Sequence, residues 1–483
     1  MNVSVTPLWT AEDAADATAG KAYGDWQADG VSIDSRTLKP GDLFVAIKGP
    51  KVDGHKFVDD ALKAGAAAVA VEPKRKKVPK GAPWLQVADT TFALEDLGRA
   101  ARQRTAARVI AVTGSVGKTS TKEALRFVLE EQGPTAGSEG SLNNQWGVPL
   151  SLARMPAETA FGVFEVGMNH PGEITPLSKM IQPHVAIITA VEAVHSAHFK
   201  SIEAIADAKA EIFNGVEAGG TAVLNRDSPL YDRLAAAARG SNIETIIGFG
   251  AVAGAEVRLV AASQESEGTD LTADVMGTSI AYRLNIPGRH WAMISLGVLA
   301  AVGAIGADVA SAAEALSGMR PPKGRGRQHR VELANGSFTV IDESYNASPA
   351  SMIAAFDVLG GMHPERGGRR IAVLGDMLEL GAGSATQHAR LAESLIRNKI
   401  DLVFTAGPEM AALWKVLPPA QRAGTADDSQ TLAPQVAEAV RAGDILVVKG
   451  SAGSNTKVIV EALLAKGETS EAEAGDQDWA VNG

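Results

Sequence analysis

Short apolar runs alternate with helix-like patterns along the whole chain. Continuous apolar runs are typical of strands that are buried on both faces of a parallel sheet. The pattern predicts strands at residues 45–47, 67–71, 108–113, 161–164, 185–188, 340–341, 371–374, 402–404 and 445–448. Because strands and helices alternate, we expect an α/β fold, in which ligands bind beside the carboxyl ends of the strands.

The chain is too long for a single hydrophobic core. Its 483 residues predict about three domains, and Pro321 and Pro322 interrupt the strand–helix alternation before the last of them. We expect a first domain at residues 1–105, a central parallel-sheet domain resembling P-loop ATPases at 106–320, a Rossmann-like third domain at 321–466, and an acidic, polar, disordered tail at 467–483.

Composition excludes several classes of function. A formal charge of −10 argues against a nucleic-acid-binding protein, and the absence of cysteine excludes disulfides and cysteine nucleophiles. The basic residues 74–77 could form a phosphate patch, but a solvated loop is favoured. Residues 291–307 are uncharged but short for a membrane span and rich in Gly and Ala, so we predict a buried helix. Residues 1–20 lack an apolar signal core, which predicts a cytoplasmic protein without membrane insertion.

The most informative motif lies at residues 113–120, Thr-Gly-Ser-Val-Gly-Lys-Thr-Ser. A predicted strand precedes it and a helical pattern follows it. In that order, backbone N–H groups and a helix N-terminus face an anion, and Lys118 adds a full charge. Thr119 supplies a hydroxyl group of the kind that holds Mg²⁺. The alternative is a Gly-rich turn with an incidental lysine, but the arrangement favours a nucleoside triphosphate site.

Two charged residues occupy positions where charge is costly. Glu165 ends an apolar strand at the expected ligand edge, which suggests a metal or a cation as its partner, although it could simply face water. Lys209 lies on the apolar face of a predicted helix, between Ile205 and Ile212. Its ammonium could extend out to water; otherwise burial would lower its pKa and allow a neutral amine.

Position alone leaves two further features undecided. His195 follows a predicted strand and could bind a metal, but the nearby His198 is an equal candidate. Asn143 and Asn144 could face a ligand with their amide groups or could form an Asx-rich turn.

Together these motifs resemble the ATP-dependent Mur ligases, which build the peptide of peptidoglycan precursors. The resemblance includes the Gly loop, Glu165, His195 and Lys209, and it extends to about residue 465. The first-domain motifs at residues 34–36, 40–46 and 53–57 and the third-domain motifs at 342–347, 375–381 and 449–451 resemble the branch that acts on a tripeptide substrate.

The resemblance implies roles for individual residues. It places uridine diphosphate near Ser35 and Arg36, and other substrate groups near Asn143, Asn144 and Asp376. It places ATP on Gly114, Ser115, Val116, Gly117, Lys118, Thr119 and Ser120, with Arg327 and Asn346 closing over the nucleotide from the third domain. Arg325 is a rival for Arg327, because Gly-Arg occurs twice. One Mg²⁺ would lie on Thr119 and Glu165, and a second on His195 and carbamoylated Lys209. Lys118, His195 and Lys209 would be the catalytic residues.

The implied reaction is the ATP-dependent addition of D-alanyl-D-alanine to UDP-N-acetylmuramoyl-tripeptide through an acyl phosphate, by a monomer that closes its third domain over the nucleotide. A ligase that adds the third amino acid, a ligase like folylpolyglutamate synthase and a regulatory P-loop switch are the alternatives. Four residues depart from the family pattern: Ser141, Ile294, Ser348 and Ala452. None belongs to the phosphate or metal set, so they affect substrate and adenine contacts and leave the reaction type unchanged.

Overall fold

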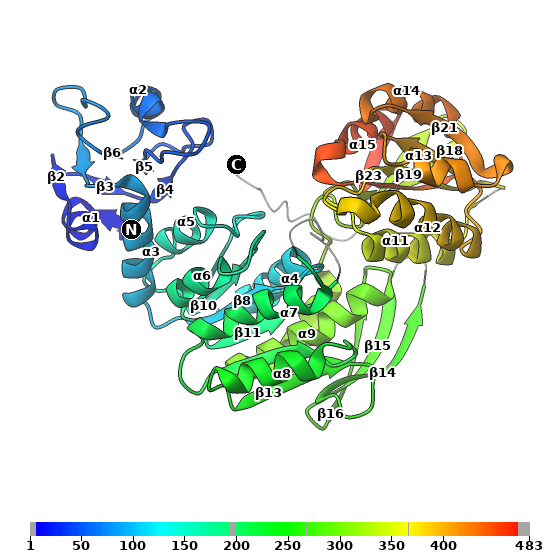
Figure 1. The fold of residues 1–483 in the computed structure, drawn as a ribbon, viewed down its shortest axis with the longest axis horizontal. Coiled ribbons are helices and arrows are strands. Elements are labelled where there is room, and N and C mark those ends of the chain that lie inside the picture. Colours follow the sequence, from blue (N-terminus) through cyan, green and yellow to red (C-terminus); the bar gives the residue numbers. More distant parts are fainter. Residues whose placement is uncertain (1–5, 193–198, 266–267, 366, 472–483) are drawn as a thin grey trace.

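Three large sheets organise the protein, each in a different part of the chain, and a two-stranded ribbon accompanies the first of them (Figure 1). The computed structural model describes residues 6–192, 199–265, 268–365 and 367–471. In the view of Figure 1 the first and third domains stand at the two upper sides, and the central domain lies below and between them. The predicted α/β fold with three domains is confirmed.

The first domain is built on a five-stranded sheet of order β2-β7-β6-β5-β4. Its strands are β2 (Lys21–Tyr23), β4 (Gly30–Ser32), β5 (Asp42–Val45), β6 (Ala68–Val71) and β7 (Trp84–Gln86), with β1 (Trp9–Thr10) and β3 (Gln27–Ala28) in a separate ribbon. Its helices are α1 (Ala11–Thr18), α2 (Val58–Lys63) and α3 (Thr90–Gln103). The Asp89 carboxylate accepts hydrogen bonds from the first-turn N–H groups of α3, and this N-cap fixes where the helix begins.

The central domain carries a nine-stranded sheet of order β16-β15-β14-β13-β12-β11-β8-β10-β9. The strands are β8 (Arg108–Thr113), β9 (Thr135–Gly137), β10 (Phe161–Glu165), β11 (Val185–Ile188), β12 (Thr221–Asn225), β13 (Thr245–Gly250), β14 (Val257–Gln264), β15 (Thr269–Val275) and β16 (Thr278–Leu284). Pairing is parallel from β9 to β14 and antiparallel from β14 to β16. The apolar runs therefore form the buried parallel part, as predicted.

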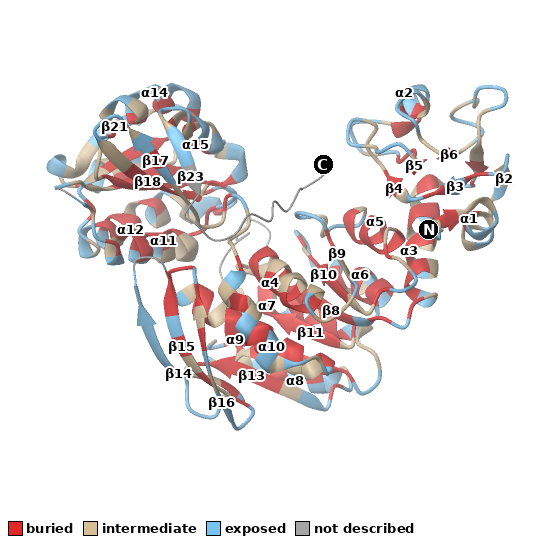
Figure 2. Cartoon of the chain, turned by 180° about the vertical axis from the view of Figure 1, so that it is seen from behind, coloured by how far each residue is buried: buried red, intermediate tan, exposed pale blue. Residues whose placement is uncertain are grey.

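Helices cover both faces of this sheet. They are α4 (Lys118–Glu130), α5 (Gly147–Ala153), α6 (Ile174–Ile181), α7 (Ile202–Ala210), α8 (Tyr231–Gly240), α9 (Arg289–Ile305) and α10 (Val309–Ala315). One core contains α4, α9 and α10, and a second contains residues of α5 to α8. Figure 2 shows α9 buried along most of its length, so the uncharged run is a buried helix as predicted. Within the described ranges no helix is long and apolar enough to cross a membrane.

The third domain has a seven-stranded sheet of order β21-β20-β19-β22-β18-β17-β23. The strands are β17 (Arg327–Leu333), β18 (Gly336–Glu343), β19 (Arg370–Gly375), β20 (Leu402–Ala406), β21 (Arg422–Ala426), β22 (Ile445–Lys449) and β23 (Glu468–Glu471). The helices are α11 (Pro349–Gly361), α12 (Ser384–Arg397), α13 (Ala411–Val416), α14 (Ser429–Ala439) and α15 (Lys457–Leu464). Pairing from β18 to β21 is parallel, so the carboxyl ends of these strands share one edge.

Two expectations need correction. We expected residues 467–483 to form a disordered tail, but β23 pairs antiparallel with β17 and extends the third sheet. The backbone of β17 offers a free ladder of hydrogen-bonding groups at the sheet edge, and a polar segment can pair with it without burying apolar side chains. The rest of the predicted tail, residues 472–483, lies outside the described residues. The first predicted strand is also shifted, because β5 ends at Val45 and excludes Ala46 and Ile47.

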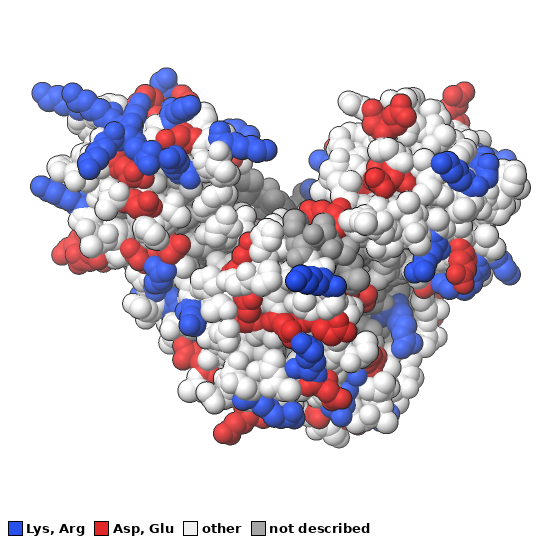
Figure 3. Space-filling model, viewed as in Figure 1, with Lys and Arg blue, Asp and Glu red and all other residues white. Residues whose placement is uncertain are grey.

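The basic run at residues 74–77 lies in the connection between β6 and β7. Arg75 pairs with Glu72, and Lys76 pairs with Asp59 at 2.6 Å. Acidic side chains of the first domain thus neutralise part of the run, and Figure 3 shows basic and acidic groups intermixed over this domain. The arrangement fits the solvated loop that the sequence favours.

Candidate active site

A cavity of about 1090 Å³ lies where the central and third domains face each other. The central domain contributes the Gly loop, the first turn of α4, Asn143 and Glu165. The third domain contributes Arg325, Tyr345 and the segment 378–380. Most of these residues follow the carboxyl end of a parallel strand, which is where open α/β sheets bind ligands.

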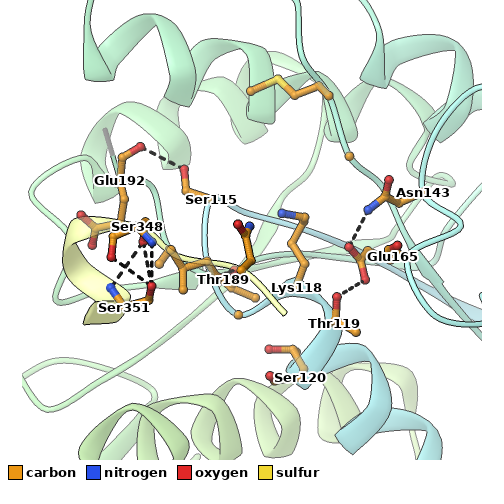
Figure 4. A pocket seen from close by; sticks show the side chains of 18 of the residues that line it. Ser115, Lys118, Thr119, Ser120, Asn143, Glu165, Thr189, Glu192, Ser348 and Ser351 are labelled. Atoms are coloured by element: carbon orange, nitrogen blue, oxygen red, sulfur yellow. Dashed lines mark hydrogen bonds between the residues drawn. The ribbon is translucent and has the colours of Figure 1, made fainter. Parts of the chain in front are cut away.

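The Gly loop forms a tight turn between β8 and α4 (Figure 4). Gly117 has a φ of +88°, which favours glycine, and a Cβ on Gly114 would lie 2.0 Å from the Thr189 hydroxyl. That hydroxyl donates a hydrogen bond to the Val116 carbonyl at 2.6 Å. Both glycines are therefore required, and the turn leaves the N-terminus of α4 open towards the cavity, where it can bind an anion.

Lys118 is the first residue of α4 and reaches back over this turn. Its Nζ donates to the Gly114 carbonyl at 3.0 Å. Burial lowers the pKa of Lys118 from its ordinary value, while the Glu165 carboxylate opposes that shift. A desolvated cation at a helix N-terminus provides strong local attraction for phosphate, which an acidic chain otherwise lacks.

Glu165 stands at the end of β10 and is 1% exposed. Its carboxylate accepts hydrogen bonds from the Thr119 hydroxyl at 2.8 Å and from Asn143 Nδ2 at 2.7 Å (Figure 4). The alternative of a strand-end glutamate that faces water is therefore wrong. A carboxylate beside a threonine hydroxyl is an oxygen donor set that fits Mg²⁺.

The described residues contain no group of three or more His, Asp or Glu side chains that could enclose a metal. His195 and its rival His198 lie outside the described residues.

Lys209 is 3% exposed at the end of α7, so the alternative that its ammonium extends to water is wrong. Its Nζ donates to the Gly114 carbonyl at 2.9 Å, the same oxygen that Lys118 uses. Burial and the Lys118 charge together hold the pKa of Lys209 well below its ordinary value. The site therefore favours a neutral amine at this position.

The two asparagines serve different purposes. Asn143 orients the Glu165 carboxylate, as described above. Asn144 Oδ1 accepts hydrogen bonds from the N–H groups of Trp146 at 3.1 Å and Gly147 at 2.9 Å, at the start of α5. Asn144 thus forms the Asx-type turn that was the open alternative, although it still lines the cavity.

The structure brings Arg325 to the Gly loop and leaves Arg327 away from it. Arg325 Nη2 donates to the Thr119 hydroxyl at 2.9 Å, and its guanidinium lies 4.1 Å from the centre of the Tyr345 ring. Arg327 is the first residue of β17, pairs in register with Asp342, and does not line the cavity. Arg325 lies in the turn before the strand, where the chain faces the central domain, so the geometry favours Arg325; the nucleotide role of Arg327 stays a prediction.

Asn346 lines the cavity as expected, beside a buried ion pair that the sequence did not reveal. Lys449 Nζ lies 3.0 Å from the Glu343 carboxylate and donates to the Asn346 carbonyl at 2.9 Å. His290, at the start of α9, also lines the cavity, and burial lowers its pKa. Glu343 and Lys449 end neighbouring parallel strands. The position of both residues at strand ends is the sequence feature that could have predicted this ion pair.

Asp376, which we expect to bind substrate, is not among the residues that line the cavity, and its substrate role stays a prediction. Its carboxylate accepts a hydrogen bond from the Met410 N–H at 2.9 Å and lies against Gly407. Burial raises its pKa above the ordinary value. Asp376 therefore ties the end of β19 to the connection after β20, because backbone N–H groups there satisfy its carboxylate.

Ser35 and Arg36 belong to the first domain and do not line the cavity. The Arg36 guanidinium pairs with Asp34 at 2.5 Å and is 85% exposed. The expected uridine diphosphate contacts are thus separate from the phosphate cradle.

Three family profiles match this chain in order. The Mur ligase family catalytic domain matches residues 27–108, the Mur ligase middle domain matches 112–302, and the Mur ligase glutamate ligase domain matches 326–452. A protein of Bacillus subtilis (strain 168) named UDP-N-acetylmuramoyl-tripeptide–D-alanyl-D-alanine ligase is 34% identical over 92% of this chain and 95% of its own length. The chain belongs to the Mur ligase family.

Other Mur ligases support this assignment along most of the chain. The Escherichia coli (strain K12) protein of the same name is 35% identical over 84% of this chain and 87% of its own length. A crystal structure of MurF from Acinetobacter baumannii has a TM-score of 0.82 at 29% identity, over 95% of this chain and 99% of that one. MurF ligase from Thermotoga maritima in complex with ADP has a TM-score of 0.75 at 26% identity, over 90% and 97%.

The geometry of the two arginines leads to a prediction for this Mur ligase. Arg325→Ala should weaken ADP binding by about tenfold or more, because a cation next to the phosphate cradle is lost. Arg327→Ala should change the dissociation constant by less than about threefold, within the effect of a residue that does not contact the ligand. Calorimetric titration with ADP measures both, and the reverse order would contradict the placement of Arg325.

Proposed function

We propose that this protein joins D-alanyl-D-alanine to UDP-N-acetylmuramoyl-tripeptide with the hydrolysis of ATP to ADP and phosphate. The observation that carries the proposal is the Gly loop with Lys118, Thr119 and Glu165 in one cavity. Support for the particular substrates comes from the curated relatives of that name, at 34% and 35% identity over most of the chain.

The reaction needs activation because a carboxylate is a poor electrophile. In the first step a carboxylate oxygen of the tripeptide attacks the γ-phosphorus of ATP, the bond to the β,γ-bridging oxygen breaks, and ADP leaves. The amine of D-alanyl-D-alanine then attacks the acyl carbon, loses a proton, and expels phosphate. Two anions meet in the first step, so Lys118 and Arg325 are suited to neutralise the developing charge.

We propose that Thr119 and Glu165 hold one Mg²⁺ and that His195 and Lys209 hold a second. Bound Mg²⁺ would neutralise phosphate charge and orient the phosphoryl oxygens. Within this arrangement Asn143 holds Glu165 in position through the Nδ2 hydrogen bond at 2.7 Å. The Glu165 carboxylate is thereby oriented towards Thr119 at the start of the cradle helix.

Lys209 is suited to carbamoylation. A neutral amine can add CO₂ and lose a proton, which replaces an unfavourable buried cation by an anion that can bind Mg²⁺. The Lys118 charge nearby would stabilise that anion, whereas it destabilises an ammonium at the same place. Replacing the Lys209 ammonium by a carbamate thus removes a repulsion by Lys118 and adds an attraction to it.

The outer domains complete the proposal. The first domain would hold the uridine diphosphate group near Ser35 and Arg36, and the third would bind the amine substrate and close over the nucleotide. Closure would exclude water, which otherwise hydrolyses an acyl phosphate. Arg325 already reaches Thr119 across this interface, so the third domain needs no new element to contact the phosphate site.

The proposed function has a direct test. Purified protein is given ATP, Mg²⁺ and UDP-N-acetylmuramoyl-tripeptide with one of three amines: D-alanyl-D-alanine, glutamate or meso-diaminopimelate. Mass spectrometry should detect the UDP-linked pentapeptide with the first amine only, and phosphate release should require both substrates. Product with glutamate or diaminopimelate instead would assign another ligase activity, and phosphate release without either substrate would favour a nucleotide switch.

Lys209→Ala distinguishes a carbamate from a structural lysine. Activity should fall by at least about a hundredfold, as for the loss of a catalytic charge, and acetate should restore part of it by supplying the missing anion. Lys457→Ala, at an exposed position in α15, is the matched control and should be unaffected by acetate. Normal activity in Lys209→Ala would contradict the carbamate.

Arg36→Ala tests the role of the first domain. The KM for the UDP-linked substrate should rise by about tenfold or more, while the KM for ATP stays within about threefold, because only one anion site has lost a cation. Lys76→Ala, in the same domain and paired with Asp59, serves as the control. Equal losses for both substrates would point to a folding defect instead.

A further inference from the structure

Lys122 is a second buried lysine of the central domain, and the reaction proposed above gives it no role. It lies in α4 one turn after Lys118, and its side chain is 0% exposed. Its Nζ donates to the Ser138 carbonyl at 2.7 Å and to the Gly140 carbonyl at 3.0 Å, and it pairs with the Glu123 carboxylate. These groups surround the whole ammonium.

The partners of Lys122 suit an ammonium group. An ammonium has three N–H donors and no acceptor, and each of the three partners is an acceptor. Burial lowers its pKa, but the Glu123 carboxylate acts in the opposite direction. Lys209 presents the contrasting case, because its Nζ donates to a single carbonyl, that of Gly114, and the neighbouring Lys118 charge lowers its pKa further. The two buried lysines thus have opposite environments.

The two carbonyls that Lys122 holds belong to the turn between β9 and α5. The same turn contacts Glu165, because the Ser138 hydroxyl accepts a hydrogen bond from the Glu165 N–H at 3.1 Å. A few residues later the chain reaches Asn143, whose Nδ2 donates to the Glu165 carboxylate at 2.7 Å. The chain segment held by Lys122 therefore touches Glu165 at both its backbone and its side chain.

The conformation of Gly140 shows why the hydrogen bonds from Lys122 to this turn matter. Its φ is +51°, and nothing lies within 4 Å of the place where a Cβ would stand. Gly140 is exposed, so a hydrogen bond to its carbonyl helps to hold the backbone at this point. Lys122 supplies one from a helix whose first turn carries Lys118 and Thr119.

We propose that Lys122 is a positioning residue: it locks the turn 138–140 onto the phosphate-binding helix and so holds Asn143 against Glu165. The inference rests on the proposed function, since it assigns Lys122 a part in aligning that site. A lysine that only stabilises the core would affect stability and leave the geometry of Asn143 unchanged. A positioning role predicts that the effects of changing Lys122 and Asn143 are coupled, whereas a purely stabilising role predicts that they are independent.

A double-mutant cycle on ligation tests the coupling. Lys122→Met keeps the aliphatic stem and removes the donors, and Asn143→Ala removes the group that it positions. Each should lower kcat/KM by about thirtyfold, and the double variant should lie within about threefold of the worse single variant. Losses that multiply to about a thousandfold would overturn the proposal, as would a negligible effect of Asn143→Ala.

A second measurement does not depend on activity. Hydrogen exchange followed by mass spectrometry should show amides of residues 138–145 exchanging at least about tenfold faster in Lys122→Met, with β20 in the third domain unchanged. Lys457→Met, at an exposed lysine, is the matched control. Unchanged exchange at 138–145 overturns the proposal even if activity falls.

Ser138→Ala covers the case in which Lys122→Met does not fold. It removes only the hydroxyl that links the turn to Glu165, and it should lower kcat/KM by about threefold to tenfold. The unpaired Glu165 N–H should lower the thermal stability modestly while the protein stays folded. Wild-type activity in a folded Ser138→Ala protein would overturn the link. If the wild-type chain ligates no D-alanyl-D-alanine, the proposed function fails, while the exchange experiment still decides whether Lys122 holds the turn.

Discussion

The carbonyl oxygen of Gly114 accepts hydrogen bonds from two lysine side chains, and much of the site follows from this contact. Lys118 comes from α4 and Lys209 from α7, so the oxygen joins elements on opposite faces of the central sheet. Two ammonium groups so close together in a buried place would repel each other, and burial together with the Lys118 charge holds the pKa of Lys209 well below its ordinary value. A negative charge at this position, where phosphate would bind, would therefore be stabilised.

The parallel sheets explain how residues that are distant in the sequence come to lie around this position. Glu165 ends β10, two strands of the third domain end in Glu343 and Lys449, and Arg325 precedes β17. Each of these residues lies beside the end of a single strand, and all of them line the cavity between the central and third domains. Arg325 donates a hydrogen bond across the cavity to the Thr119 hydroxyl, and Lys449 pairs with Glu343 on the third-domain side. A ligand would therefore enter a site whose polar groups are oriented in advance.

The departures from the family pattern fit this organisation. Ser348 caps α11, where its hydroxyl accepts a hydrogen bond from the Ser351 N–H, and it also lines the cavity. Ser141 and Ile294 line the cavity, whereas Ala452 begins a short 3-10 helix beyond it. The four departures thus lie around the phosphate cradle and leave the Gly loop, Glu165 and Lys209 intact. This placement agrees with the expectation that they affect substrate and adenine contacts and leave the reaction type unchanged.

The sequence alone determined what depends on local pattern. Apolar runs located the parallel strands, the Gly spacing located the phosphate cradle, and the anomalous positions of Glu165 and Lys209 indicated buried charges. Other assignments depended on side-chain direction and on contacts between distant segments. Arg325 and Arg327 are two residues apart, and only the start of β17 separates the one that reaches Thr119 from the one that does not. Asp376 looked like a ligand at a strand end, but neighbouring backbone N–H groups use its carboxylate. Lys122 matched the pattern of an ordinary helix lysine, because its partners Ser138 and Gly140 come together with it only when β9 pairs with β10 and brings the turn beside α4.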